Sequence, residues 1–173
     1  RSVSVLLCGG IGGGAQAALA GVGIEICSGA EEAALSFFGA TDGGDSGVID
    51  IGGGSTEVIV GTDMNVRCGF SCQMGAVRLH RLQSIHSAEE AEIVTAMASD
   101  ILSPVRQRFV TTDPNMNWVG VGGTFTTSAA VVQRIPWQKR EKIHHYKMTQ
   151  EELREAIVFL APMPLEERLQ LEC

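Results

Sequence analysis

The stretch G-V-I-D-I-G-G-G-S-T-E-V-I-V-G at residues 47–61 decides how the chain is expected to fold. The β-branched residues Val48, Ile49 and Ile51 surround Asp50, which predicts a short buried strand with one carboxylate near its carboxyl end. Three glycines follow and favour a tight turn, and a second run rich in β-branched residues predicts the returning strand. The stretch is therefore expected to form a hairpin with a polar tip.

The tip of this hairpin is a candidate phosphate site. Gly52, Gly53 and Gly54 leave backbone N–H groups uncovered, and successive N–H groups that point into one hollow bind anions. The hydroxyls of Ser55 and Thr56 would add hydrogen-bond donors.

Two acids flank the turn and are candidate metal ligands. Asp50 and Glu57 would hold a divalent metal directly or through water, since Mg²⁺ takes a few carboxylates together with phosphate oxygens. A tight turn with an incidental acid on each side is the structural alternative, and a glycine-rich turn alone does not decide between the two.

A second glycine turn follows another apolar strand, in W-V-G-V-G-G-T at residues 118–124. The next residues, F-T-T-S-A-A-V-V, predict the start of a helix, with Thr124 or Thr126 placed to cap it. Because a helix N-terminus carries partial positive charge, Gly122, Gly123 and Thr124 form a second candidate phosphate site. The two glycine turns are therefore expected to form the two walls of one cleft.

Four motifs occur in order along the chain: S-G-A-E-E-A (28–33), D-I-G-G-G-S-T-E (50–57), M-G-A-V-R-L (74–79) and G-V-G-G-T (120–124). Together they resemble the exopolyphosphatase/guanosine pentaphosphate phosphohydrolase (Ppx/GppA) family, and the second motif is the most specific of them. The resemblance covers roughly residues 21–169. It implies an α/β fold of the actin, sugar kinase and Hsp70 superfamily: a ribonuclease-H-like (actin-like ATPase) domain with three layers and a central mixed sheet.

The resemblance also implies a division of the chain. The superfamily's first glycine hairpin, of the D-x-G-[ST]-N-[ST] type, has no counterpart here, and the strand and helix that complete its second domain are missing after Leu171. We therefore expect a fold that is incomplete at both ends, with residues 1–40 as the tail of a first actin-like domain and residues 47–173 as the second. The polar residues 41–47 between them are expected to act as a hinge.

The activity implied by the resemblance is hydrolysis of terminal phosphoanhydride bonds in inorganic polyphosphate or guanosine pentaphosphate, and the sequence does not choose between these substrates. Glu32 matches the family's catalytic glutamate, which orients or deprotonates the attacking water. The cofactor expected near Asp50 and Glu57 is Mg²⁺ or Mn²⁺. The family's usual arginine two positions after the glutamate is Ala34 in this chain.

Two other functions stay open at this level. A regulatory module that binds phosphate or nucleotide without chemistry is consistent with Ala34 and with the absent first hairpin. A phosphotransferase similar to sugar or acetate kinases shares the fold, but the S-G-x-E-E motif so close before the hairpin speaks against it.

Composition limits the class of partner. The net charge of −7 argues against a nucleic-acid binder that neutralises phosphates over a broad face, so a polyanion must be met locally. No apolar run approaches the length of a membrane span. Five scattered cysteines indicate neither a disulfide framework nor a zinc site, and a reducing cytoplasm is the expected location. Homodimer formation is left open.

Helical patterns fill much of the remaining chain. Ser87 is predicted to cap a helix over residues 87–110 that Pro104 should kink or interrupt. Its expected core face is Ile93, Met97, Ile101, Leu102 and Val105. Thr149 is predicted to cap a later helix, while Arg78 is expected either to reach phosphate or to lie on a solvated helix face.

Overall fold

The computed structural model describes residues 5–7, 25–27, 37–63, 65–109 and 116–171. The predicted catalytic Glu32 and its neighbour Ala34 lie outside these residues. The strands are β1 (Val5–Leu7), β2 (Glu25–Cys27), β3 (Asp45–Ile51), β4 (Thr56–Thr62), β5 (Asn65–Cys72) and β6 (Asn117–Val121). The helices are α3 (Ala76–Leu82), α4 (Ala88–Phe109), α5 (Gly123–Gln133), α6 (Arg140–Ile143), α7 (Gln150–Leu160) and α8 (Leu165–Arg168).

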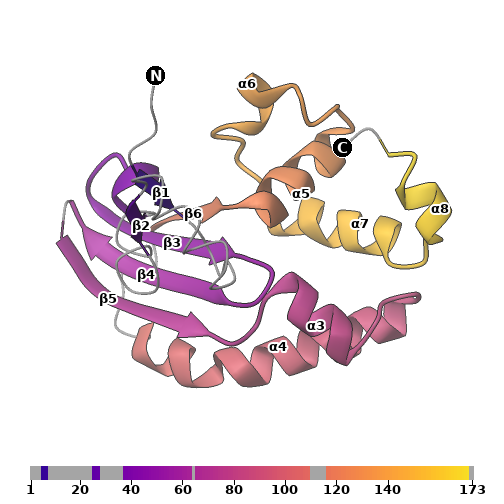
Figure 1. Ribbon diagram of the computed structural model, residues 1–173, viewed down its shortest axis with the longest axis horizontal. Coiled ribbons are helices and arrows are strands. Elements are labelled where there is room, and N and C mark those ends of the chain that lie inside the picture. Colours follow the sequence, from indigo (N-terminus) through magenta and orange to yellow (C-terminus); the bar gives the residue numbers. More distant parts are fainter. Residues whose placement is uncertain (1–4, 8–24, 28–36, 64, 110–115, 172–173) are drawn as a thin grey trace.

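The main sheet has the strand order β5-β4-β3-β6 and is mixed (Figure 1). Strands β3 and β4 form the predicted antiparallel hairpin, β4 pairs with β5 in the same way, and β6 runs parallel to β3. Strands β1 and β2 form a separate parallel pair. The structure therefore confirms the α/β class and the mixed sheet, whereas the division into two domains stays a prediction.

The sheet carries apolar side chains on both faces, as expected where side chains alternate along a strand. On one face Val48 and Ile59 pack with Phe37, and all three side chains are fully buried. On the other face Val58 packs with residues of α3 and α4, including Val105. Figure 1 shows α4 lying along this second face.

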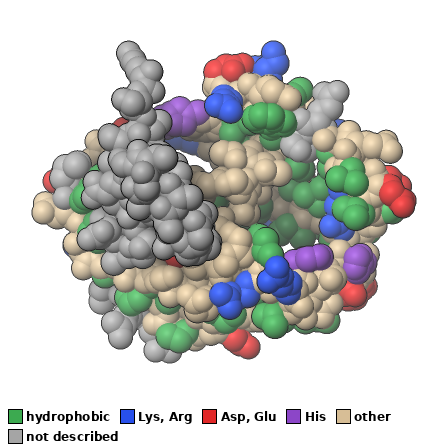
Figure 2. All heavy atoms as spheres, viewed as in Figure 1, with side chains coloured by type: hydrophobic (Ala, Val, Ile, Leu, Met, Phe, Trp, Pro, Cys, Tyr) green, Lys and Arg blue, Asp and Glu red, His purple; other side chains and the backbone are tan. Residues whose placement is uncertain are grey.

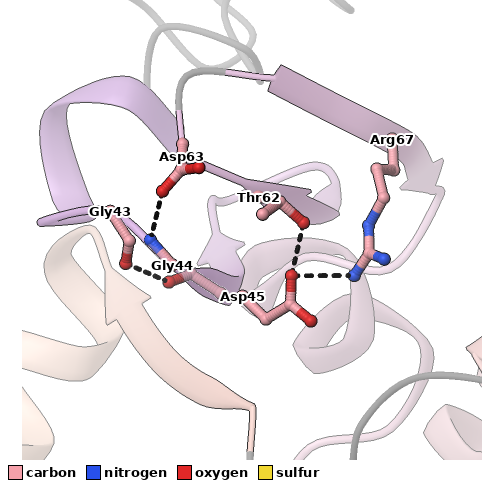
Figure 3. A network of polar contacts seen from close by, with 7 residues as sticks. Gly43, Gly44, Asp45, Thr62, Asp63 and Arg67 are labelled. Atoms are coloured by element: carbon pink, nitrogen blue, oxygen red, sulfur yellow. Dashed lines mark hydrogen bonds and ion pairs between the residues drawn. The ribbon is translucent and has the colours of Figure 1, made fainter.

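The open end of the hairpin is tied by a polar network, drawn in Figure 3. Asp45 accepts a hydrogen bond from the Thr62 hydroxyl and forms an ion pair with Arg67 at 3.5 Å. The Gly44 N–H donates to Asp63 Oδ1 at 2.8 Å. Strand β3 thus begins at Asp45, so part of the expected hinge belongs to the sheet.

Helix α4 begins where the sequence predicts. Ser87 Oγ accepts the Glu90 N–H at 3.2 Å, and Glu90 in turn accepts the His86 N–H at 2.6 Å. The helix continues past Pro104 to its end, so Pro104 does not interrupt it, and the alternative of a kink stays a prediction. Ile93 is 49% exposed and not part of the core, although Ala91 in the same turn of α4 is buried, so Ile93 does not lie on the core-facing side of the helix. Within the described chain, no helix combines the length and apolar character that a membrane span needs.

Candidate phosphate-binding site

Asp50 and Glu57 lie opposite each other across the hairpin, as paired residues in the register of β3 and β4. Directly opposed residues project from the same face of a sheet, so both half-buried carboxylates lie on one face. Glu57 accepts a hydrogen bond from the Ser71 hydroxyl at 2.8 Å, which orients its carboxylate. The two predicted metal ligands are therefore neighbours.

All three carbonyl groups of the glycine turn accept hydrogen bonds from residues of α3. The Gly52 carbonyl accepts the Ala76 N–H at 2.9 Å, and the Gly53 carbonyl accepts the Arg78 N–H at 3.0 Å. The Gly54 carbonyl accepts a hydrogen bond from the Arg78 side chain, through Nε at 2.8 Å. These bonds direct three consecutive peptide carbonyls toward one side, the side of α3.

The N–H groups of the turn must then point the other way. No described peptide bond is cis, and in a planar trans peptide the carbonyl and the following N–H point in opposite directions. The N–H groups of Gly53, Gly54 and Ser55 are thus directed away from α3, and in the described part of the chain none of them donates to a protein acceptor. Gly53 and Gly54 are exposed. Three donors turned to one side of an exposed turn are suited to bind an anion.

The turn sits close against the start of α3. A Cβ atom placed on Gly75 would lie 2.5 Å from the Gly54 nitrogen and equally close to the Gly53 carbonyl oxygen, so only glycine fits there. The Thr56 hydroxyl donates to the Met74 carbonyl, and Thr56 is 2% exposed. Thr56 faces away from the carboxylates, since it alternates with Glu57 along β4. Its hydroxyl therefore fixes the turn and does not line the anion site.

The second glycine turn lies directly beside Asp50. In the parallel pairing of β3 with β6, Asp50 is opposite Val121, the residue before the turn. A Cβ atom on Gly122 would lie 2.7 Å from Asp50 Oδ1, and Gly122 has a φ of 87°, which favours glycine. The Thr124 hydroxyl donates to the Ile51 carbonyl at 3.1 Å, which joins the two turns. The structure thus brings the two predicted phosphate sites together.

The predicted threonine cap of α5 is wrong. The N-cap residue is Gly122, without a side-chain cap, and both Thr124 and Thr126 lie inside the helix. The hydroxyl of Thr124 instead donates its hydrogen bond to the Ile51 carbonyl, next to the first glycine turn. The exposed Gly122 and Gly123 leave the N-terminus of this 11-residue helix open beside Asp50, where its partial positive charge favours anions.

The donor set fits some metals better than others. Among the described residues, no group of three or more His, Cys, Asp or Glu side chains is placed to hold an ion. Two neighbouring carboxylates suit an ion that takes its other ligands from water and phosphate, which is the preference of Mg²⁺. Cys72 does not add a thiolate, because burial first and the charge of Glu57 second raise the pKa of its thiol.

Arg78 is a site residue whose role the sequence did not resolve. The structure places its guanidinium on the carbonyl side of the glycine turn, with one further hydrogen bond from NH2 to Gln73 Oε1 at 3.1 Å. The M-G-A-V-R-L motif at residues 74–79 draws attention to Arg78 in the sequence. It does not predict the hydrogen bond to Gly54, because the two residues lie 24 positions apart.

A cavity of about 440 Å³ opens on the opposite face of the sheet, between the strands and α4. Its lining is mostly apolar and includes Ile49, Val58, Leu102, Trp118 and Phe125. It contains neither of the two carboxylates and does not suit a phosphate.

Comparison with known proteins identifies the family of this chain. Residues 15–173 match the model of the Ppx/GppA phosphatase family. Exopolyphosphatase 2 of Mycobacterium tuberculosis is 34% identical over 164 residues, which are 90% of this chain and 50% of that protein. A bifunctional 3-dehydroquinate synthase/phosphatase of Fusobacterium nucleatum is 29% identical over 142 residues, covering 75% of this chain and 21% of that protein.

Solved structures show the same fold. The Aquifex aeolicus Ppx/GppA enzyme superposes with a TM-score of 0.70 at 26% identity, over 87% of this chain and 50% of that one. An exopolyphosphatase from Cytophaga hutchinsonii superposes with a TM-score of 0.68 at 24% identity, over 90% of this chain and 54% of that one. The chain thus spans about half the length of exopolyphosphatase 2 and of the Aquifex aeolicus enzyme. It belongs to the Ppx/GppA phosphatase family and has that family's actin-like ATPase fold.

Proposed function

We propose that this protein hydrolyses terminal phosphoanhydride bonds of inorganic polyphosphate or guanosine pentaphosphate. Membership of the Ppx/GppA family supports the reaction class, and the similarity to a protein named exopolyphosphatase supports polyphosphate as a substrate. The observation in this chain that carries the proposal is the set of three hydrogen-bonded carbonyls at Gly52, Gly53 and Gly54, which turn the following N–H groups away from α3.

These N–H groups would bind the terminal phosphate without a broad basic surface. On the face shown in Figure 2, Lys and Arg side chains form small separate groups and not one broad patch. Backbone donors at the first turn, and the start of α5 at the second, would supply local positive potential in a chain of net charge −7.

Asp50 and Glu57 would hold Mg²⁺, or Mn²⁺ in its place, directly or through water. The metal, when bound, would neutralise charge on the phosphate oxygens as the transferred group separates. Two like charges placed directly opposite each other destabilise a hairpin, and a cation near both would offset that cost. This is a physical reason for the pair to occur at a metal site.

Glu32 would orient the attacking water and accept its proton. The water oxygen would form a bond to the terminal phosphorus in line with the bridging oxygen, whose bond to that phosphorus breaks. The bridging oxygen keeps the electron pair and leaves with the shortened chain. The position of Glu32 in this mechanism stays a prediction.

Phosphate release from polyphosphate, with and without Mg²⁺, tests the proposal. Replacing a general base slows such reactions by about 10²- to 10⁴-fold, so Glu32→Gln should lose activity by that amount and still bind substrate. Glu151→Gln, on the exposed surface of α7, is the matched control and should be as active as the wild type. Equal rates for Glu32→Gln and the wild type would contradict the mechanism.

The same assay separates the alternative function. Mg²⁺-dependent binding of polyphosphate with no release of phosphate would instead support a phosphate-binding regulatory module. The alanine at position 34 is consistent with that alternative. A cytoplasmic location is part of the proposal and is supported by Cys68 and Cys72, which are both free thiols. The homodimer and the lack of nucleic-acid binding stay predictions.

A further inference from the structure

Arg78 is bonded to the glycine turn through both its backbone and its side chain. Its N–H donates to the Gly53 carbonyl at 3.0 Å, and its Nε donates to the Gly54 carbonyl at 2.8 Å. Gln73 Oε1 accepts from NH2 at 3.1 Å and holds the other end of the guanidinium. The side chain is exposed, so these hydrogen bonds, and not burial, determine where it lies.

The three carbonyls of the turn differ in what holds them. The Gly52 and Gly53 carbonyls accept backbone N–H groups, which almost any sequence can supply. The Gly54 carbonyl is held by the Arg78 side chain. Because each carbonyl sets the direction of the next N–H, the Gly54 carbonyl determines where the Ser55 N–H points.

We propose that Arg78 is a positioning residue for phosphate binding. By fixing the Gly54 carbonyl toward α3, it directs the Ser55 N–H to the same side as those of Gly53 and Gly54 and completes the three-donor array. This role rests on the proposed function of the turn and deepens it, because it identifies the side chain that sets the geometry of the phosphate site.

The geometry argues against direct contact between Arg78 and phosphate. The Nε atom bonds to a carbonyl of the turn, and the carbonyl side is opposite to the side on which the N–H groups are exposed. Arg78 therefore acts through the turn. Arginine suits this role because its planar group can bond to Gly54 and Gln73 at once in a fixed orientation, which the single ammonium group of lysine cannot reproduce.

Calorimetric titration of the full chain with inorganic tripolyphosphate and Mg²⁺ tests the proposal. Loss of one oriented hydrogen bond to phosphate corresponds to about a tenfold change in Kd, so Arg78→Met should bind about tenfold more weakly. Arg81→Met is the matched control, because Arg81 is exposed on the same helix and its loss removes the same charge. It should change the Kd less than about twofold. Arg78→Lys keeps the charge and should bind as weakly as Arg78→Met.

Wild-type affinity in Arg78→Lys, or equal losses in Arg78→Met and Arg81→Met, would overturn the positioning role in favour of a simple charge effect. If the wild type binds tripolyphosphate and Arg78→Met binds it equally well, the inference fails while the proposed function stands. If the wild type does not bind, the proposed function itself fails, and the positioning role fails with it.

A second measurement separates positioning from a general loss of structure. The backbone amide signal of Ser55 in the ligand-free protein should shift in Arg78→Met and not in Arg81→Met, while signals from the distant helix α7 stay unchanged. Gln73→Ala removes only the anchor of the guanidinium and should weaken binding about two- to threefold, which provides a milder variant if Arg78→Met does not fold. An unchanged Ser55 signal in Arg78→Met would overturn the proposal.

Discussion

Replacing Gly75 with alanine is expected to separate the glycine turn from α3. The added Cβ would lie 2.5 Å from the Gly54 nitrogen and from the Gly53 carbonyl oxygen, and both are backbone atoms that cannot rotate away. The turn must therefore move as a unit. Its movement breaks the three hydrogen bonds that Ala76 and Arg78 of α3 donate to the carbonyls of the turn.

The expected cost follows from those three hydrogen bonds. Each contributes about 0.5–1.5 kcal/mol net, because water replaces a partner that is lost at an exposed turn. We expect Gly75→Ala to lower the free energy of unfolding by about 2–4 kcal/mol. The same movement disperses the N–H groups, so the affinity for tripolyphosphate should fall by at least about tenfold.

Urea unfolding followed by circular dichroism measures the first effect, and calorimetric titration of the folded variant measures the second. Gly69→Ala is the matched control, because a Cβ on Gly69 in β5 meets its nearest atom at 3.8 Å, an ordinary contact. A Gly75→Ala protein with the stability and the tripolyphosphate affinity of Gly69→Ala would refute the reasoning.

Three further substitutions test other parts of the structure. Gly122→Ala forces a side chain into a φ of 87° and against Asp50, and should cost about 1–3 kcal/mol of stability and weaken Mg²⁺-dependent binding of tripolyphosphate. Arg168→Met removes a guanidinium that donates to three backbone carbonyls, at 2.8, 3.0 and 3.1 Å, and should lower the urea midpoint by an amount equivalent to about 1.5–3 kcal/mol. The pKa of Glu152 is lowered, first by the Thr149 N–H, so its ionised form stabilises the fold, and this contribution disappears as pH falls below about 4.5. Glu152→Gln should therefore lose less stability than the wild type between about pH 6 and about pH 3 in urea titrations.

Each of these substitutions has a control on the same element or of the same type. Gly123→Ala places its Cβ in open space at an ordinary φ, and Arg154→Met removes an arginine side chain that is 68% exposed. Both should stay within about 0.5 kcal/mol of the wild type. Glu155→Gln, exposed on the same helix as Glu152, should keep the wild-type pH dependence. Equal effects on stability in a variant and its control would contradict the assigned contact.

The hairpin and its facing acids could be predicted because local sequence encodes them. Alternating β-branched residues define the two strands, and three glycines define the turn, which fixes the register that pairs Asp50 with Glu57. The capping residues Ser87 and Thr149 were predicted correctly for the same reason, since a cap involves only residues within one turn of a helix.

Contacts between distant segments could not be predicted in this way. The close approach of Gly75 to the turn and the bond from Arg78 to Gly54 depend on how α3 packs against β3 and β4. Thr124 or Thr126 was predicted to cap the helix that follows, but the Thr124 hydroxyl instead donates to the Ile51 carbonyl of the neighbouring strand. Ile93 has helical spacing with core residues, yet it is exposed while Ala91 in the same turn is buried.

The most direct test of the account is a titration of the ¹⁵N-labelled chain with inorganic tripolyphosphate in the presence of Mg²⁺, followed by two-dimensional NMR. The account predicts that the amide signals of Gly53, Gly54 and Ser55 shift most, together with those of Gly122 and Gly123, at a common Kd. Saturating binding that leaves the first three signals unchanged would contradict it.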